Sequence, residues 1–202
     1  MLAAGLAVLA GYVDATGFIV LGGYFIAFMS GNSTRMAVGL VRGAPSSILS
    51  GMLIASFVLG VVCGSFAGHF AWRNREMWVL IIVALLLACA AITGSGGHIE
   101  IAVIAMALAM GAENTVFERD GEVRIGVTYM TGTLVKLGQR ITGAILGGDR
   151  FAWVGYLLLW MGLVAGAAMG AFAFPLLGWA ALWIGASAAL VFAGFARLAL
   201  KP

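Results

Sequence analysis

Long apolar runs separated by short polar breaks follow one another along most of the chain. Each run is about 20 residues long, the length that a helix needs to cross the hydrocarbon core of a bilayer. The first run has no positively charged flank and ends in a polar break rather than a cleavage site, so we interpret it as a span and not a signal peptide. The pattern predicts spanning helices over residues 2–20, 47–72, 77–93, 99–117, 151–174 and 176–198.

The composition supports a membrane protein and excludes an ordinary soluble domain. Of the 202 residues, 63% are apolar and 9% are charged, whereas about a quarter of a soluble domain is charged. The 11 lysines and arginines are scattered singly along the chain, so we expect no nucleic-acid partner. Because the sequence has no CxxC motif and no cluster of histidine and cysteine, we also expect no metal and no cofactor. The expected partner is the lipid bilayer.

Basic residues are unevenly distributed among the predicted loops, and this asymmetry sets the orientation. Residues 73–76 and the C-terminal stretch are basic, whereas residues 94–97 and the turn expected at Pro175 contain no lysine or arginine. Since basic loops stay on the cytoplasmic side, residues 73–76 and the C-terminus are predicted to be cytoplasmic. The charged segment 118–124 then lies on the same side, and we interpret it as a solvated turn.

Two stretches between predicted spans must leave one membrane surface and return to it. Residues 22–45 do so on the outer face, and residues 123–150 on the cytoplasmic face. Each begins with an extended apolar piece, 24–29 or 123–130, and continues with a sequence that can form a helix. We therefore predict two re-entrant segments, each an extended segment plus a half-helix, that enter from opposite faces.

The two halves of the chain resemble each other at an offset of 100 to 102 residues. The matched polar and glycine positions are Gly11 with Gly111, Asp14 with Asn114, Met29-Ser30-Gly31 with Met130-Thr131-Gly132, and Arg35 with Lys136. Six identities in twelve positions also match Gly60, Val62, Gly64, Gly68, Phe70 and Ala71 with Gly162, Val164, Gly166, Gly170, Phe172 and Ala173.

An internal duplication of three spans leaves the second copy upside down relative to the first, because three is odd. Inverted repeats of this kind are common in secondary transporters, which bind substrate near the midplane where the copies meet. The sequence thus predicts an all-α polytopic membrane protein of about six transmembrane helices, a 3+3 inverted repeat of residues 1–97 and 98–202 in one membrane domain. The alternative is an old duplication that was kept only for packing.

Two ladders of glycine at every fourth position favour close helix packing. The two ladders, one in each half, are Gly60, Gly64 and Gly68, and Gly162, Gly166 and Gly170. Glycine on one face of a helix lets a second helix approach closely. These faces join either the two halves of one chain or two chains in a homodimer, and the sequence does not decide between them.

The start of each predicted half-helix is the candidate substrate site. Ser30 and Thr131 are expected as N-caps. Helix N-termini expose unpaired backbone N–H groups and a partial positive charge, which favour an anion or a polar oxygen. Non-helical backbone at membrane depth must be buried by protein or lined by water, so a polar cavity is expected. The predicted substrate-binding residues are Ser30, Gly31, Asn32, Arg35, Thr131, Gly132, Thr133 and Lys136.

Three acidic or amide side chains within the predicted spans are candidate partners of the cations Arg35 and Lys136. Asp14, Glu113 and Asn114 are candidates for proton or ion coupling, or for ion pairs, because a polar group within a span is expensive. Two simpler interpretations stay open. Asp14 pairs with Arg35 for stability alone, or Glu113 is a solvated charge at a helix end.

Several of these residues form motifs that resemble a known family. The chain carries AGYVDA at residues 10–15, SGN at 30–32 and TGTL at 131–134. This combination resembles the YoaK family of bacterial multipass membrane proteins over nearly the whole chain. The resemblance implies an inner-membrane protein of about six spans in a family with no established activity. Ser30 and Ser33 occupy positions where the family pattern has threonine, which leaves a hydroxyl in place.

The leading functional hypothesis is a small secondary transporter of an anionic or polar small solute, bound between the two half-helix N-termini near the midplane. A passive channel on the same scaffold and a non-transporting membrane scaffold or sensor are the alternatives. An enzyme is not expected, because a nucleophilic Ser30 or Ser33 would need His69 as its base from the far end of another span.

Overall fold

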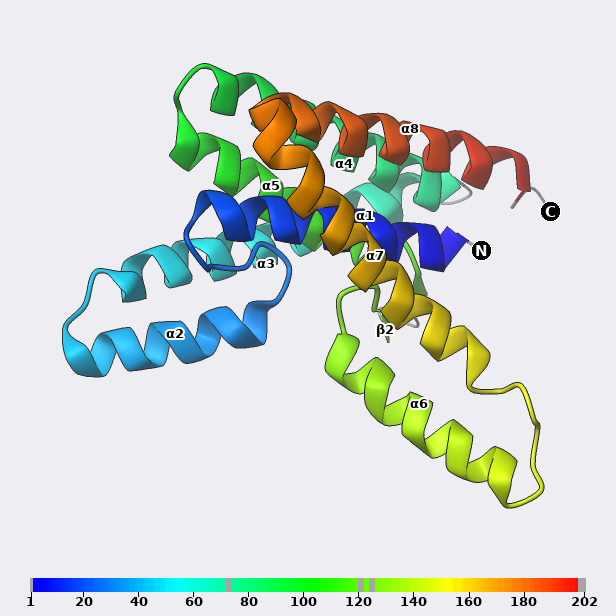
Figure 1. The fold of residues 1–202 in the computed structure, drawn as a ribbon. Coiled ribbons are helices and arrows are strands. Elements are labelled where there is room, and N and C mark those ends of the chain that lie inside the picture. The colour runs from blue at the N-terminus through cyan, green and yellow to red at the C-terminus, as the bar shows by residue number, and fades with distance from the viewer. Residues whose placement is uncertain (1, 72–73, 120–121, 124–125, 200–202) are drawn as a thin grey trace.

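The computed structural model describes residues 2–71, 74–119, 122–123 and 126–199 (Figure 1). Trp72, the predicted end of the second span, and Arg73, Asp120, Arg124 and Lys201, which belong to predicted cytoplasmic segments, lie outside these residues. The helices are α1 (Leu2–Val20), α2 (Met29–Arg42), α3 (Ser46–Ala71), α4 (Arg75–Ser95), α5 (Ile99–Glu113), α6 (Met130–Ile145), α7 (Val154–Leu177) and α8 (Leu182–Ala199). A short antiparallel ribbon, β1 (Glu118–Arg119) and β2 (Glu122–Val123), precedes α6, and the 3-10 turn η2 (Gly178–Ala181) joins α7 to α8.

Four stretches of the described chain are long and apolar enough to cross a membrane. They are Leu2–Val20, Ser46–Ala71, Arg75–Ser95 and Val154–Leu198. The last stretch comprises α7, η2 and α8, and the chain reverses between the two helices (Figure 1). The composition and these helices together support a multipass membrane protein.

Two predicted boundaries are wrong. The fourth span was expected to continue to residue 117, but α5 ends at Glu113 and a turn follows. Its 15 residues span about 22 Å at 1.5 Å per residue, less than the roughly 30 Å of a hydrocarbon core. The turn expected at Pro175 lies elsewhere, because Pro175 is inside α7. The helix ends at Leu177, and the next residue, Gly178, has a positive φ of 57°, which glycine adopts readily.

The core is formed mainly by α1, α4, α5 and α8, whose buried side chains are largely alanine, valine, leucine and methionine. α1 packs against α7, α3 against α5, and α4 against both α5 and α8. At two of these crossings glycine brings backbones into contact: a Cβ on Gly11 would overlap the carbonyl oxygen of Leu163, and a Cβ on Gly111 would overlap that of Phe57. Such crossings depend on small residues.

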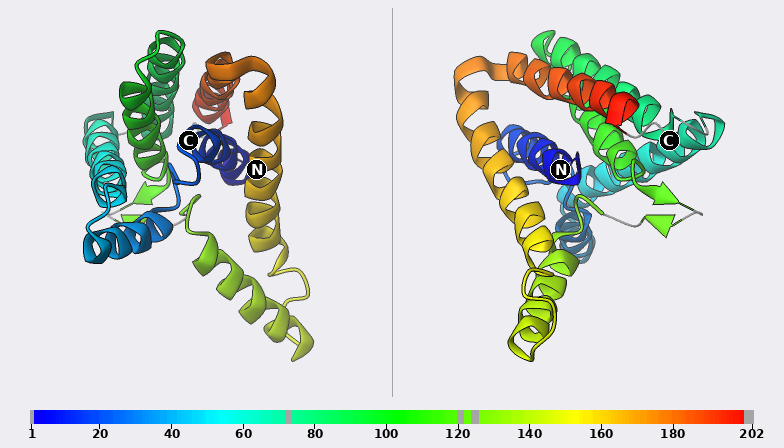
Figure 2. Two further views of the ribbon diagram at one scale, coloured as in Figure 1. Left: turned by 60° about the vertical axis from the view of Figure 1, so that its left-hand side comes forward. Right: turned by 90° about the vertical axis from the view of Figure 1, so that its right-hand side faces the viewer.

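α2 and α6, the helices that the sequence predicts as half-helices, lie at the edge of this core. α2 packs along α3, and α6 contacts α7 (Figure 1). Figure 1 and the left-hand view of Figure 2 show the N-terminal ends of α2 and α6 pointing toward the middle of the molecule and the C-terminal ends pointing away from it. We refer to residues 24–28 and 126–129, which precede α2 and α6, as the lead-in segments.

Candidate functional site

Asp14, in the last third of α1, holds the first lead-in segment. One of its carboxylate oxygens, Oδ1, accepts hydrogen bonds from the backbone N–H groups of Ile26 and Ala27, both at 2.7 Å. Ile26 and Ala27 are buried, so their amides need a partner within the protein. The carboxylate supplies that partner where no helix or sheet does. The expected alternative in which Asp14 pairs with Arg35 is therefore wrong for this structure.

Asn32 fixes the same lead-in segment from the other side. Its side-chain Oδ1 accepts a hydrogen bond from the backbone N–H of Phe25 at 3.1 Å, and its Nδ2 donates to the carbonyl oxygen of Phe25 at 2.6 Å. Asn32 is fully buried. It therefore replaces, for one residue, the backbone pairing that a strand would provide, and it is not available to contact a solute as the sequence predicted.

The first turn of α2 begins without a side-chain cap. The N-cap residue is Phe28, and no side chain caps the helix, so the expectation that Ser30 is the N-cap is wrong. The backbone N–H of Met29 donates to Ala27 O at 3.1 Å. Within the described residues the N–H groups of Ser30 and Gly31 have no acceptor. Two donors therefore remain free at a helix N-terminus.

The start of α6 has the same construction. Its N-cap is Tyr129, again with no side-chain cap, so Thr131 is not the N-cap that the sequence predicted. The N–H of Met130 donates to Thr128 O at 2.9 Å. In the part of the chain that is described, Thr131 and Gly132 also have N–H groups without an acceptor.

Asn114 occupies the position in the second half that Asp14 occupies in the first. Its Oδ1 accepts a hydrogen bond from the hydroxyl of Thr128 at 3.1 Å, and its Nδ2 donates to Met110 O at 2.9 Å. Thr128 belongs to the second lead-in segment. Asn114 thus holds the second lead-in segment by a bond to the side chain of Thr128, whereas Asp14 holds the first lead-in segment by bonds to two of its backbone amides.

The two predicted cations differ in their surroundings. The guanidinium carbon of Arg35 lies 4.8 Å from the centre of the Tyr24 ring, a distance at which a cation and a ring attract each other. Arg35 and Lys136 are both exposed, as are Ser30, Thr131 and Gly132, whereas Thr133 is buried. The accessible members of the predicted set are thus the two cations and the residues at the free N–H groups.

Glu113 is completely buried, and neither carboxyl oxygen has a hydrogen-bond partner among the described residues. The interpretation of Glu113 as a solvated charge at a helix end is therefore wrong. The prediction failed because a charged residue at a helix end is usually exposed, and α5 does end at Glu113. Here the following residues, Asn114, Thr115 and Val116, are buried as well.

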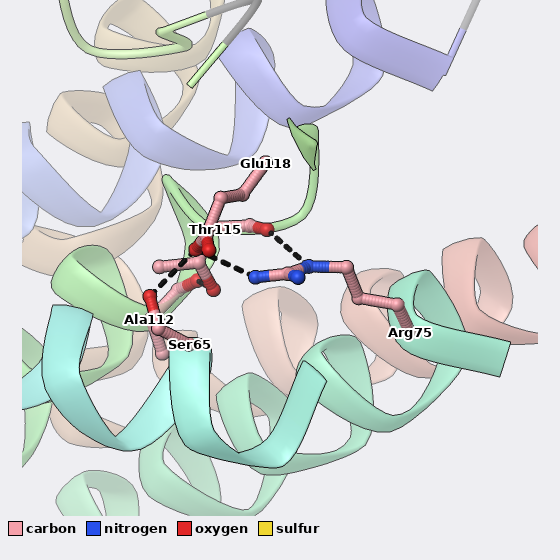
Figure 3. Close-up of polar contacts among 5 residues, drawn as sticks. All are labelled: Ser65, Arg75, Ala112, Thr115 and Glu118. Carbon is pink, nitrogen blue, oxygen red and sulfur yellow. Dashed lines mark hydrogen bonds and ion pairs between the residues drawn. The ribbon is translucent and has the colours of Figure 1, made fainter. Parts of the chain in front are cut away.

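A second polar cluster joins α3, α4 and the turn after α5 (Figure 3). Arg75 Nη2 lies 2.6 Å from Glu118 Oε2, and Arg75 Nε donates to Thr115 O at 3.1 Å. The hydroxyl of Ser65 donates to the same carboxylate oxygen at 2.6 Å. Both ionised side chains are more than four-fifths buried. Glu118 was expected in a solvated turn, so the structure corrects this interpretation and adds a site that the sequence analysis missed.

The glycine ladders are occupied by helices of the same chain. In the first ladder, a Cβ on Gly60 would overlap Leu108 O, one on Gly64 would press on Ala112 and Thr115, and one on Gly68 would press on Arg75. In the second, Gly162, Gly166 and Gly170 face Ala4 O, Val8 O and Tyr12 O, all in α1. A homodimer through these faces would require the helices of one chain to separate first.

The described residues group no metal ligands, and an open cavity lies away from the two helix starts. In the described part of the chain, no three residues of histidine, cysteine, aspartate and glutamate are grouped as metal ligands. An open cavity of about 340 Å³ lies at the far end of α6, away from its N-terminus, and is lined by Ile141, Ala144, Ile145, Arg150 and Trp153.

Comparison with known proteins places the chain in a family. Residues 2–195 match the family described as "Protein of unknown function (DUF1275)". The chain belongs to DUF1275. One similar protein is UPF0700 transmembrane protein RA0705 of Rhizobium meliloti (strain 1021), 38% identical over 164 residues, which covers 81% of this chain and 71% of that protein.

A second relative carries the name that the motifs suggested. UPF0700 transmembrane protein YoaK of Bacillus subtilis (strain 168) is 26% identical over 144 residues, which covers 67% of this chain and 64% of that protein. No solved structure matches the chain. The family match and the similarity to YoaK together confirm the predicted family, and the names of both relatives support a transmembrane protein.

Proposed function

We propose that the protein is a small secondary transporter of an anionic or polar small solute, which binds where the N-termini of α2 and α6 face the middle of the molecule. Each N-terminus offers two backbone donors, at Ser30 and Gly31 and at Thr131 and Gly132. Helix N-termini attract anions through these donors and through the helix dipole. Arg35 and Lys136, one turn further along each helix, would add positive charge.

The observation that carries the proposal is the equal construction of the two helix starts. In both, the first helical N–H bonds back to the residue two positions earlier, at 3.1 Å for Met29 and 2.9 Å for Met130. In both, a fully buried aliphatic residue of the lead-in segment, Ile26 or Val127, anchors the turn. A duplication accounts for this shared detail, and two halves of one binding site would retain it together with the free N–H donors.

The packing of the spans supports an inverted repeat of residues 1–97 and 98–202. Gly11 of α1 faces Leu163 O and Ala167 N of α7, and Gly111 of α5 faces Phe57 O and Val61 N of α3. Each contact joins one proposed repeat to the other. The α3 and α7 residues correspond at an offset of 106 (163 − 57 and 167 − 61), one helical turn beyond the sequence alignment at 102.

We propose an orientation with the C-terminus and the Arg75–Glu118 cluster on the cytoplasmic side of a bacterial inner membrane. The support is the distribution of basic residues among the loops. We also propose that the protein is not an enzyme, since the hydroxyl of Ser33 already donates to Met29 O at 2.8 Å and no base lies within hydrogen-bonding distance of it among the described residues.

The test is a thermal-stability screen of the purified protein against a panel of small anions and polar metabolites. A compound that binds only the folded protein raises the apparent stability by mass action, by about 2.7 kcal/mol at one hundred times its dissociation constant. Arg35→Ala and Lys136→Ala should abolish the shift. Arg42→Ala and Arg140→Ala, which remove exposed cations nearer the C-terminal ends of the same helices, should leave the shift unchanged.

The outcomes separate the candidate functions. A shift that depends on Arg35 and Lys136, followed by uptake of that compound into proteoliposomes against its gradient, supports the transporter. Uptake that proceeds only down the concentration gradient of the compound indicates a passive channel. No shift from any compound, with all variants folded, would contradict the binding site and favour a scaffold or sensor.

A further inference from the structure

Glu113 is the one carboxyl group in the described residues that is both completely buried and without a partner. Glu113 is the last residue of α5, and the backbone of α5 contacts α3 close to this point. Gly111, two residues earlier, lies against Phe57 O of α3, and Gly64 of α3 lies against Ala112. The last turn of α5 therefore cannot move away from α3 without loss of these contacts.

The titratable groups of α1 and the arginine of α4, two helices that pack against α5, are already engaged. In α1, the hydroxyl of Tyr12 donates to Ala181 O at 2.8 Å, and Asp14 accepts from the first lead-in segment. In α4, Arg75 is committed to Glu118 and to a backbone carbonyl. Neither helix supplies a described cation that could neutralise Glu113.

The remaining titratable groups on the neighbouring helices do not compensate Glu113 either. Glu76, next to Arg75 at the start of α4, is itself acidic and is partly exposed. Cys63 and His69 of α3 and Cys89 of α4 are exposed. None of these side chains bonds to Glu113 within the described residues.

An isolated carboxylate is far more expensive to bury than a neutral carboxyl group, so a buried acid without a partner takes up a proton. Ionisation would require water or a cation to reach it. Both require the turn after α5, which buries Asn114 and Thr115, to open. Because Asn114 also bonds to Thr128 of the second lead-in segment, this opening would move the N-terminus of α6.

We propose that Glu113 is the proton-binding site of this protein: its carboxyl group holds a proton while the end of α5 is closed and releases it to water when the turn opens, which shifts the start of α6. Coupling of this proton to a solute rests on the proposed function. The residue 100 positions earlier is the buried Val13, and the acid beside it, Asp14, differs from Glu113 because its carboxylate already accepts two backbone N–H groups.

Infrared spectroscopy of the purified protein tests proton binding without any solute. We expect the carbonyl stretch of a protonated carboxyl group at neutral pH in the wild type. Glu113→Gln, which is neutral and nearly the same size, should remove the band, and Glu113→Asp should move it. Glu100→Gln, an exposed acid in the first turn of the same helix, should leave it unchanged. The absence of a protonated band that depends on residue 113 would overturn the proposal.

Thiol labelling tests the movement of α6. In a background of Cys63→Ala and Cys89→Ala, we expect the labelling rate of Thr131→Cys, divided by that of Ser30→Cys at each pH, to rise several-fold as pH increases. Glu113→Gln should make the ratio independent of pH. A ratio that stays constant with Glu113 present would overturn the coupling to α6. Both experiments omit solute, so they can succeed while the transport proposal fails, or the reverse.

Discussion

Replacement of Asp14 by asparagine should destabilise the first lead-in segment measurably. In the native protein a single carboxylate oxygen accepts two backbone N–H groups, both at 2.7 Å. Asparagine can still offer one oxygen, but without the negative charge. Alanine offers none and leaves the amides of Ile26 and Ala27, which are buried, without a partner.

The size of the effect follows from the number of bonds. A hydrogen bond to a charged group contributes about 1.5–3 kcal/mol, and one between neutral groups about 0.5–1.5 kcal/mol. Asp14→Asn should therefore lower the free energy of unfolding by about 1 kcal/mol for each bond, or about 2 kcal/mol in total. In a protein of this size that corresponds to a fall in Tm of about 4–8 °C. Asp14→Ala should cost more, about 2–4 kcal/mol, because two donors lose their only acceptor.

Thermal unfolding of the detergent-purified variants measures both values, with Glu100→Gln as the control for removal of one exposed charge. We expect the order wild type, Asp14→Asn, Asp14→Ala, with the control close to wild type. If Asp14→Ala melts at the wild-type temperature, the carboxylate does not hold the lead-in segment, and the reasoning from its hydrogen bonds is wrong.

Three other perturbations test the packing and the polar clusters. Gly166→Ala should prevent folding or lower Tm by more than about 5 °C, because the added methyl group overlaps a carbonyl oxygen of α1. The control Gly194→Ala, whose added methyl group meets open space, should not lower Tm in this way. Equal Tm values for the two variants would contradict the packing of α7 on α1. Asn32→Leu should cost about 2–4 kcal/mol since both backbone groups of a lead-in residue lose their partner, and a wild-type Tm would argue against that role. For Arg75→Met and Glu118→Leu, a double-mutant cycle should give a coupling of about 1–3 kcal/mol; additive losses would show that the ion pair is not a stabilising contact.

The hydropathy pattern predicted the positions of the long helices well because burial in a bilayer depends on length and composition. α1 begins and ends at the predicted residues 2 and 20, and α3 begins within one residue of its prediction. Helix ends were less predictable. A proline was expected to mark a turn, yet α7 continues past Pro175 to Leu177 and ends at a glycine with positive φ.

The candidate site was predicted in part. The repeat of Met29-Ser30-Gly31 as Met130-Thr131-Gly132 identified where α2 and α6 begin, since the chemistry of a helix start is local. The caps were wrong because an aromatic residue, Phe28 or Tyr129, fills the N-cap position. The partners of Asp14 could not be predicted from the sequence, because they are backbone N–H groups. Every residue except proline carries such a group, and only the folded chain brings these two next to the carboxylate.

Hydropathy and motifs could not predict contacts between segments that are far apart along the chain. Arg75 and Glu118 lie 43 positions apart (118 − 75), and each sits in a stretch that reads as an ordinary charged loop. Glu113 reads as a helix-end charge until the following turn is seen to cover it. In both cases burial depends on how α3, α4 and α5 pack, which hydropathy along one chain does not encode.

The most direct measurement of the central claim is the aqueous accessibility of the two half-helix starts. Ser30→Cys and Thr131→Cys, each made in the Cys63→Ala and Cys89→Ala background and reconstituted in liposomes, would be treated with a membrane-impermeant thiol reagent. Leu158→Cys, at an exposed apolar position of α7, serves as the lipid-facing control. We expect both positions at the helix starts to react and the control not to react. If neither helix start reacts from either side of the membrane, no water-lined solute site exists between them.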